Sequence, residues 1–109
     1  FSSGQFNIVV LYHVLSNLSF KERKMAIEEI KRVLKKSGLL LFQDFLRGDF
    51  RDSKKVRNKI NYYYFTHKEI KTMLKGFKIK EYNIIKFKPF SKSNKSRRIF
   101  RCIAEMPRH

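Results

Sequence analysis

The stretch that decides the fold runs from Asn7 to Phe45 and reads NIVVLYHVLSNLSFKERKMAIEEIKRVLKKSGLLLFQDF. It begins and ends with apolar runs of strand length, Asn7 to Leu11 and Leu39 to Phe42. Runs without polar alternation are typical of strands that are buried on both faces of a parallel sheet. The segment between them has the length and the spacing of a crossover helix. The stretch therefore predicts a right-handed βαβ unit.

The predicted helix carries signals at both of its ends. Ser19 is followed three residues later by Glu22, which is the spacing of a capping box that satisfies two backbone N–H groups at a helix start. Apolar residues then recur at helical spacing and form one stripe: Ala26, Ile27, Ile30, Val33 and Leu34. We predict that Lys35, Lys36 and Gly38 close the helix, because cations and glycine favour its C-terminal end.

The second half of the chain adds a short helix and two strands. Thr66 and Glu69 repeat the capping-box spacing at the start of the helix, and Gly76 ends it. Phe77 to Phe87 and Arg98 to Glu105 are rich in strand-forming residues. The simplest arrangement is an antiparallel pair that ends the sheet. The expected fold class is α/β.

Length and composition are those of one intracellular domain. The 109 residues are 42% hydrophobic, which is enough for a core. Cys102 is the single cysteine, so an internal disulfide is excluded, and with no Cys/His cluster we expect no metal site. No apolar run approaches the ~20 residues of a membrane helix. We expect a soluble protein of the cytoplasm, with the nucleus as the alternative, and no membrane partner.

Positive charge is concentrated in the second half of the chain. The net charge is +17, and residues 47–109 contribute 14 of it. Such a surface attracts polyanions such as nucleic acid, although the codon bias of an adenine- and thymine-rich genome would also enrich lysine. Tyr63, within the aromatic run from Tyr62 to Phe65, is a candidate for base stacking, and Phe65 alternatively packs in the core. The candidate phosphate contacts are Lys54, Lys55, Arg57, Arg97 and Arg98.

Three segments in this order resemble the C-terminal half of class I S-adenosylmethionine-dependent methyltransferases. They are FNIVVLYHVLSNL at residues 6–18, AIEEIKRVLKKSGLLLF at 26–42 and FTHKEIKTMLKGFKI at 65–79. The resemblance implies a doubly wound, Rossmann-like sheet. Two parallel strands with one helix cannot supply such a sheet alone, so we expect residues 1–109 to be a partial methyltransferase domain without its N-terminal cofactor-binding half.

The same resemblance implies a site at the carboxyl ends of the strands. Leu11, Tyr12 and His13 would lie beside the methionine portion of S-adenosylmethionine, and Asp44 would face the methyl acceptor as the catalytic residue. The alternatives are a His13 that is bonded to backbone and an Asp44 that caps backbone N–H groups. The sequence has no glycine-rich loop after a first strand, so we expect the chain alone to be inactive and to bind the cofactor only together with the missing half.

Within that family the chain is most similar to the methyltransferase-like enzymes that form 3-methylcytidine in tRNA. The similar residues are Val14 to Ser16, Leu41 to Phe45, Tyr63 to Thr66 and Arg98 to Phe100, and Gln43 stands where that subfamily has Arg. The similarity implies tRNA modification with RNA as the partner, and an accessory protein subunit is a further candidate partner. A small-molecule methyltransferase fragment and a non-catalytic, basic RNA-binding fragment are the alternatives.

Overall fold

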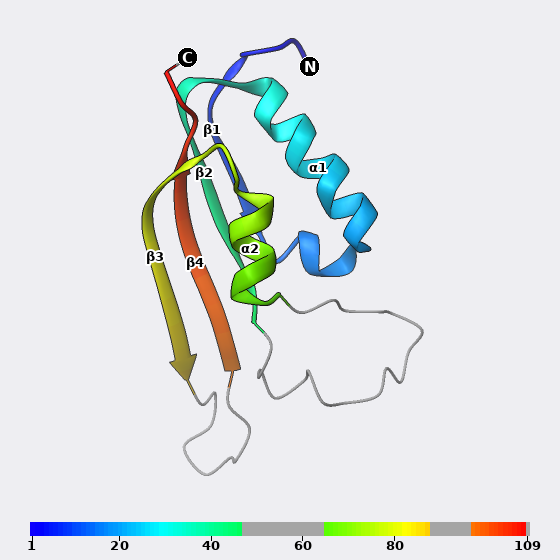
Figure 1. Ribbon diagram of the computed structural model, residues 1–109, viewed down its shortest axis with the longest axis vertical. Helices are drawn as coiled ribbons and strands as arrows, with labels where there is room; N and C mark the ends of the chain where they lie inside the picture. Colours follow the sequence, from blue (N-terminus) through cyan, green and yellow to red (C-terminus); the bar gives the residue numbers. More distant parts are fainter. Residues whose placement is uncertain (47–64, 88–96, 109) are drawn as a thin grey trace.

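The computed structural model describes residues 1–46, 65–87 and 97–108, and within them it has a four-stranded sheet in the order β1-β2-β4-β3 (Figure 1). Strands β1 and β2 are parallel, and β4 is antiparallel to both β2 and β3. The predicted α/β class, the βαβ unit and the antiparallel pair are confirmed. In the antiparallel pair, β4 lies next to β2, and β3 is the outer strand. The elements are β1 (Phe6–Tyr12), the 3₁₀ turn η1 (Leu15–Asn17), α1 (Phe20–Val33), β2 (Leu34–Phe45), α2 (His67–Met73), β3 (Lys78–Phe87) and β4 (Arg97–Glu105).

The predicted capping box starts α1. The hydroxyl of Ser19 accepts a hydrogen bond from the N–H of Glu22 at 3.3 Å, and the carboxylate of Glu22 accepts one from the N–H of Ser19 at 3.0 Å. The pair satisfies two of the N–H groups that have no partner inside the helix.

No helix in the described ranges is long and apolar enough to cross a membrane.

The C-terminal end of α1 differs from the prediction. The helix ends at Val33, and β2 begins at Leu34, which is extended at ψ 138° and pairs with Phe6 of β1. The side chain of Leu34 is 4% exposed within the core. Burial of this side chain and pairing with β1 stabilise the chain more than another turn of helix would. The residues that were wrongly predicted to close the helix belong to β2 instead: Lys35, Lys36 and Gly38.

Gly38 lies where the backbone of β2 passes close to other backbone. A Cβ at this position would lie 2.8 Å from the carbonyl oxygen of Lys35 and 3.1 Å from that of Asn7. We expect Gly38→Ala to lower the free energy of unfolding by about 1–3 kcal/mol, because backbone atoms cannot move aside without displacing a strand. Urea denaturation followed by circular dichroism measures this, with Ser37→Ala as the neighbouring control. Equal losses in the two variants would contradict the steric reason.

Both helices pack on the same face of the sheet and enclose the core (Figure 1). Phe65 is fully buried there, with its ring 5.5 Å from those of both Phe42 and Phe100 in edge-to-face contacts. Its predicted core position is therefore confirmed. The other predicted stacking tyrosines, 62–64, lie outside the described residues. The core also includes Leu15, Ile27, Ile30, Leu34, Leu40, Leu46, Ile70, Leu74, Cys102 and Ala104.

The face of the sheet opposite the helices is bare along β1 within the described residues. Side chains alternate along β1, and those of Ile8, Val10 and Tyr12 point away from the helices. Their exposed fractions are 53%, 51% and 48%. β1 is also the outermost strand on its side of the sheet. An apolar face and a parallel edge strand are thus both open to a partner.

Candidate functional site

The carboxyl ends of the two parallel strands meet at one edge of the sheet. Tyr12 at the end of β1 pairs with Gln43 near the end of β2, so His13 and Asp44 follow side by side. β4 runs the other way and places Arg101 opposite Gln43. In open α/β sheets, ligands bind outside this end of the strands. The residues at this edge are therefore the candidate site.

His13 is held by its backbone in an uncommon conformation. Its φ of 58° lies in the left-handed region, which few residues other than glycine adopt. Its N–H donates to the carbonyl oxygen of Gln43 at 2.8 Å, and its ring lies 4.5 Å from the ring of Phe45. The side chain stays 34% exposed. The ring contacts the amide side chain of Gln43 rather than a backbone group, so the alternative of a ring bonded to backbone is not observed among the described residues, and the ring reaches the surface of the site.

A chain of hydrogen bonds sets the tautomer of His13. The Nε of Arg101 donates to Oε1 of Gln43 at 2.8 Å, which leaves the Gln43 amide nitrogen to donate to Nε2 of His13 at 3.0 Å. Nε2 is then an acceptor, so the proton of a neutral ring lies on Nδ1. Nδ1 has no hydrogen-bond partner among the described residues, and Oδ1 of Asp44 lies 3.8 Å from it.

We expect Gln43→Leu to release this tautomer. Loss of a hydrogen bond of about 1 kcal/mol corresponds to a roughly fivefold change in the Nδ1–H to Nε2–H ratio. Nitrogen-15 NMR of the imidazole measures the ratio. Gln43→Glu is the matched variant, because its carboxylate only accepts and therefore favours a proton on Nε2. A wild-type ring that carries its proton mainly on Nε2 would contradict the assignment.

Asp44 is fully buried at the end of β2 and secures the turn after β1. Its carboxylate accepts hydrogen bonds from the N–H of Ser16 at 3.0 Å and from the N–H of Phe45 at 2.8 Å. Burial raises the pKa of Asp44, whereas the bonds from Phe45 and Ser16 and the nearby His13 lower it. The carboxylate thus caps backbone N–H groups, as one of the alternatives proposed. Its catalytic role stays a prediction.

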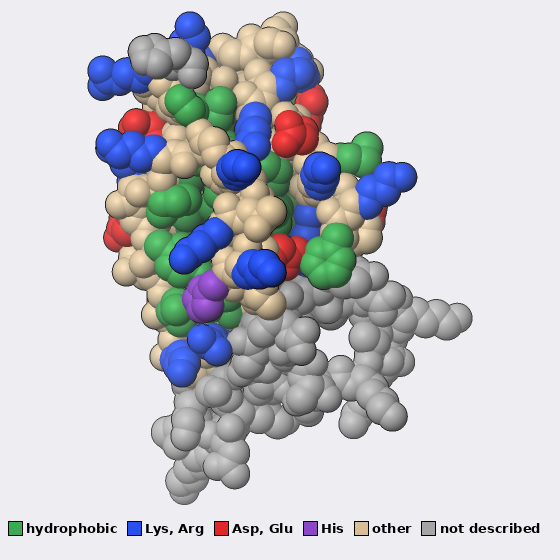
Figure 2. Space-filling view, viewed as in Figure 1, with side chains coloured by type: hydrophobic (Ala, Val, Ile, Leu, Met, Phe, Trp, Pro, Cys, Tyr) green, Lys and Arg blue, Asp and Glu red, His purple; other side chains and the backbone are tan. Residues whose placement is uncertain are grey.

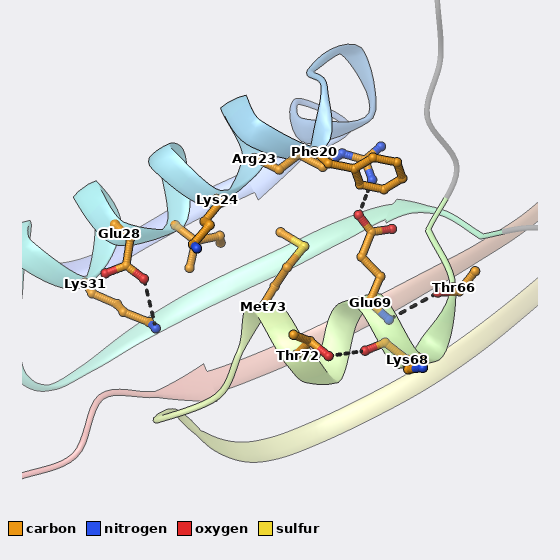
Figure 3. Close-up of a pocket in the computed structure, with 11 residues that line it drawn as sticks. Phe20, Arg23, Lys24, Glu28, Lys31, Thr66, Lys68, Glu69, Thr72 and Met73 are labelled. Carbon is orange, nitrogen blue, oxygen red and sulfur yellow. Dashed lines mark hydrogen bonds and ion pairs between the residues drawn. The ribbon is translucent and has the colours of Figure 1, made fainter.

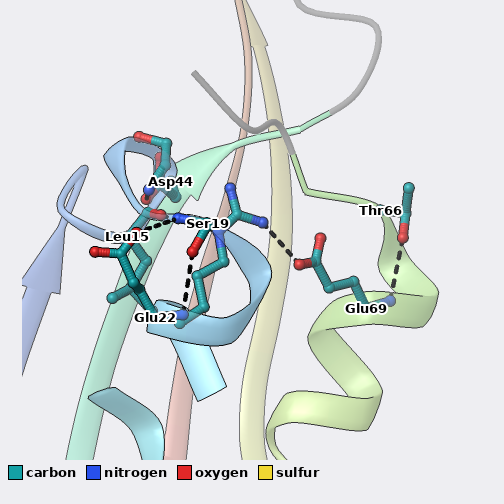
Figure 4. Close-up of polar contacts among 8 residues, drawn as sticks. Leu15, Ser19, Glu22, Asp44, Thr66 and Glu69 are labelled. Carbon is teal, nitrogen blue, oxygen red and sulfur yellow. Dashed lines mark hydrogen bonds and ion pairs between the residues drawn. The ribbon is translucent and has the colours of Figure 1, made fainter. Parts of the chain in front are cut away.

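Arg23 is a buried residue near this site that was not predicted. Figure 4 shows Ser19 and Glu22 at the start of α1, and Thr66 and Glu69 at the start of α2. The Nε of Arg23 donates to the carbonyl oxygen of Leu15 at 2.9 Å, and its Nη1 bonds Glu69 of α2 at 2.7 Å. Its guanidinium carbon lies 3.8 Å from the centre of the Phe65 ring. Arg23 therefore joins η1, α1 and α2 behind the edge that carries His13 and Asp44.

The second predicted capping box forms only in part because of Arg23. The hydroxyl of Thr66 accepts from the N–H of Glu69 at 3.1 Å, as expected. The carboxylate of Glu69 bonds Arg23 instead of the backbone of Thr66. One sequence signal was available, since Arg23 and Ile27 are four residues apart and share the buried side of α1.

The other predicted site residues are spread over the sheet. Leu11 packs against the core, whereas Tyr12 is half-exposed on the bare face, so the two side chains do not face the same ligand surface. Arg97 is 9% exposed, with its guanidinium carbon 4.3 Å from the centre of the Phe45 ring, and Arg98 is half-buried. Four predicted contacts lie outside the described residues: Lys54, Lys55, Arg57 and Tyr63.

Neither metal binding nor a reactive cysteine is supported by the described residues. No group of three His, Cys, Asp or Glu side chains there could hold a metal ion. Cys102 is 1% exposed, and burial raises the pKa of its thiol to about 11, so it is not a thiolate at neutral pH. The candidate site is therefore the cluster of Tyr12, His13, Gln43 and Asp44, with Arg101 beside it.

The N-terminal part of the chain, which ends just before Gln43 and Asp44, matches a known family model. Residues 1–42 match a family model for a methyltransferase domain. They include β1, η1, α1 and most of β2. A search of the curated proteins finds none that matches the chain.

Solved structures with the same fold include methyltransferases and one enzyme of another kind. A SAM-dependent methyltransferase from Methanosarcina mazei superimposes with a TM-score of 0.82 at 22% identity, over 100% of this chain and 63% of that one. A protein from Bacillus halodurans, assigned as a methyltransferase, gives 0.78 at 18% identity, over 98% and 67%. The [4+2]-cyclase SpnF gives 0.70 at 14% identity, over 98% and 52%.

The chain spans between 52% and 67% of the lengths of these three proteins. Its sheet and helices are a part of a Rossmann-like methyltransferase fold, as the sequence predicted. SpnF illustrates that this fold also serves a cyclase, so the fold by itself does not define the reaction.

Proposed function

We propose that this chain is part of a methyltransferase domain that transfers the methyl group of S-adenosylmethionine to RNA, with a tRNA cytidine as the acceptor. The observation that carries the proposal is the cluster of Tyr12, His13 and Asp44 at the carboxyl ends of two parallel strands, which is where ligands of such sheets bind. The match of residues 1–42 to a methyltransferase domain covers β1 and β2 up to Phe42, and supports it.

Tyr12 and His13 would hold one side of the cofactor. S-adenosylmethionine, when bound, supplies a methyl group on a positively charged sulfonium, which is attracted to the face of an aromatic ring. The Tyr12 ring is 48% exposed at the end of β1, and His13 offers ring atoms beside it. Both residues fit such a cofactor. The sequence has no glycine-rich turn to hold its methionine and ribose portions.

The bare face of the sheet supports a partial domain. Ile8, Val10 and Tyr12 leave apolar surface open on a parallel edge strand, and parallel sheets are normally covered on both faces. We propose that further polypeptide covers this face, adds strands beside β1 and completes the cofactor site. Methyl transfer then requires the completed domain, and this chain alone is inactive.

In the proposed reaction, the main role of the described residues is to align the reactants rather than to act as an acid or a base. Methyl transfer is an in-line displacement, and cytosine N3 already has a lone pair, so positioning and exclusion of water are the main tasks. Asp44 is buried and bonded to Ser16 and Phe45, and it faces His13. We assign Asp44 a positioning role, in which it holds the turn after β1 that begins with His13.

Positive charge supports RNA as the acceptor. Residues 47–109 hold 14 of the 17 excess charges, and Arg98 and Arg101 of β4 lie at or near the candidate edge. Cationic side chains bind phosphates and orient a nucleic acid without reading its bases. Basic RNA binding without catalysis is a second candidate, favoured by the same charge.

The test compares this chain with the longest natural polypeptide that contains it. Isothermal titration with S-adenosylmethionine should show binding only for the longer protein, and mass spectrometry of tRNA incubated with it should detect 3-methylcytidine. A longer protein without cofactor affinity would refute methyl transfer. RNA binding that falls steeply with salt, in a protein that forms no methylated product, would favour the non-catalytic candidate. Methylation of a small molecule alone would refute RNA as the acceptor.

A further inference from the structure

A groove of about 450 Å³ lies between α1 and α2 on the helix-covered face (Figure 3). Its lining comes from both helices and includes three large apolar side chains. Phe20 is 63% exposed at one end, Met73 is half-buried, and Ile27 is 2% exposed at the floor. This volume falls in the range of about 300–1,000 Å³ that is typical of ligand-binding pockets.

The two walls of the groove are fixed relative to each other. At one end Arg23 of α1 bonds Glu69 of α2 at 2.7 Å. Toward the other end Lys31 of α1 donates to the carbonyl oxygen of Lys75, beyond α2, at 3.1 Å. Cross-links near both ends hold the helices apart at one spacing, so an occupant does not have to order the walls.

The charges that line the groove leave a positive surplus. Its two carboxylates are already paired, Glu69 with Arg23 and Glu28 with Lys31 at 3.5 Å. Lys24 on α1 and Lys68 on α2 line opposite walls, and neither takes part in an ion pair within the described residues. Figure 2 shows Lys and Arg side chains spread over the same face of the molecule. Within the part of the chain that the structure describes, the groove is thus a largely apolar channel with Lys24 and Lys68 outside any ion pair.

We propose that this groove binds an amphipathic helix of a partner protein whose apolar side chains are flanked by acidic residues. Helices bind in such grooves through apolar anchors at i, i+3, i+4 and i+7, and acidic flanks would meet Lys24 and Lys68. Exposed Phe20 and the adaptable Met73 favour a peptide over a nucleic acid, which would need a row of unpaired cations along its backbone.

The position of the groove gives the partner a route to the candidate site. Arg23 lines the groove and donates to the carbonyl oxygen of Leu15 in the turn that follows β1. A bound helix therefore lies against the same buried side chain that supports η1 behind His13. This docking site is separate from the bare face of the sheet and does not depend on the proposed methyl transfer.

Fluorescence anisotropy tests the proposal with a labelled helical peptide of leucines at i, i+3, i+4 and i+7 flanked by glutamates. Lys24→Glu/Lys68→Glu should weaken binding about tenfold or more, because each reversal places like charges together. Phe20→Ala, at a largely exposed position, should weaken it about fivefold. Lys78→Glu/Lys86→Glu on β3 is the matched control for net charge and should change binding less than about twofold.

Three outcomes would overturn the proposal. The first is no binding of the peptide up to about 1 mM. The second is an equal loss in the β3 control or equal binding of a peptide with lysines in place of glutamates, since either would indicate attraction without a site. The third is displacement of the peptide by single-stranded RNA together with an unchanged affinity of Phe20→Ala, which would assign the lysines to nucleic acid. Circular dichroism of each variant confirms that it is folded.

Discussion

Replacing Arg23 with methionine is expected to lower the free energy of unfolding by about 2–4 kcal/mol, somewhat less than for a fully buried ion pair because Glu69 is partly exposed. Arg23 is 1% exposed, and its guanidinium bonds both Leu15 and Glu69. Methionine fills much of the same volume but donates no hydrogen bond. The carbonyl of Leu15 and the carboxylate of Glu69, which is 16% exposed, would then lose their partner away from water.

Urea denaturation followed by circular dichroism measures this loss. Arg32→Met is the control, because Arg32 also lies on α1 and also pairs with a glutamate, Glu29, but its side chain is 39% exposed against 1% for Arg23. Its denaturation midpoint should stay close to that of the wild type. Arg23→Met combined with Glu69→Gln should lose less than the sum of the two single variants, since no unpaired carboxylate remains. Equal effects of the two arginine variants would contradict the proposed role of Arg23.

Local signals were sufficient for the starts of the helices. The capping box of Ser19 and Glu22 forms within one helical turn, and every atom that it needs lies within four residues. The similar spacing of Thr66 and Glu69 misled in one respect, because the carboxylate of Glu69 bonds Arg23, 46 residues away in the sequence. A contact between two helices cannot be predicted from the local sequence of either helix.

The end of α1 was mispredicted for a similar reason. Two lysines and a glycine after an apolar stripe are a sound local stop signal. The helix nevertheless ends earlier, because Leu34 pairs with Phe6 of β1 and enters the core. Whether a boundary residue continues a helix or starts a strand depends on a neighbouring strand that the local sequence does not contain.

The candidate site was predictable as far as parallel pairing determines it. Strands that run the same way end at one edge, so His13 and Asp44 were expected to lie together. The link from Arg101 through Gln43 to His13 was not predictable, since it requires the antiparallel register of β4. Burial of Asp44 was also not predictable, because it depends on η1 folding over the end of β2.

Asp44→Asn is expected to lower the free energy of unfolding by about 1–3 kcal/mol at neutral pH. The carboxylate accepts hydrogen bonds from two backbone N–H groups, those of Ser16 and Phe45, and it is fully buried. Asparagine has one acceptor oxygen, so its amide NH₂ would face the second backbone donor. The free-energy cost of the unpaired N–H donor is larger than the free energy gained by removing the buried charge. Thermal or urea denaturation of the two proteins measures the difference.

The pH dependence of that difference tests the state of the carboxyl group. Burial raises the pKa of Asp44 in the folded chain above its ordinary value. At a pH between the ordinary pKa and the raised pKa, Asp44 is protonated in the folded chain but not in the unfolded chain. The stability that this proton contributes is therefore complete below the ordinary pKa, and it is lost as the pH rises through the pKa of the folded chain. Asparagine does not titrate. The advantage of the wild type over Asp44→Asn should therefore shrink from about pH 4 to pH 7.

Comparison with Asp44→Asn isolates this group, because the two proteins share every other titratable side chain. An advantage that grows with pH would contradict the raised pKa. It would mean that the hydrogen bonds from Ser16 and Phe45, together with a positive charge on His13 3.8 Å away, outweigh burial and hold the carboxylate ionised.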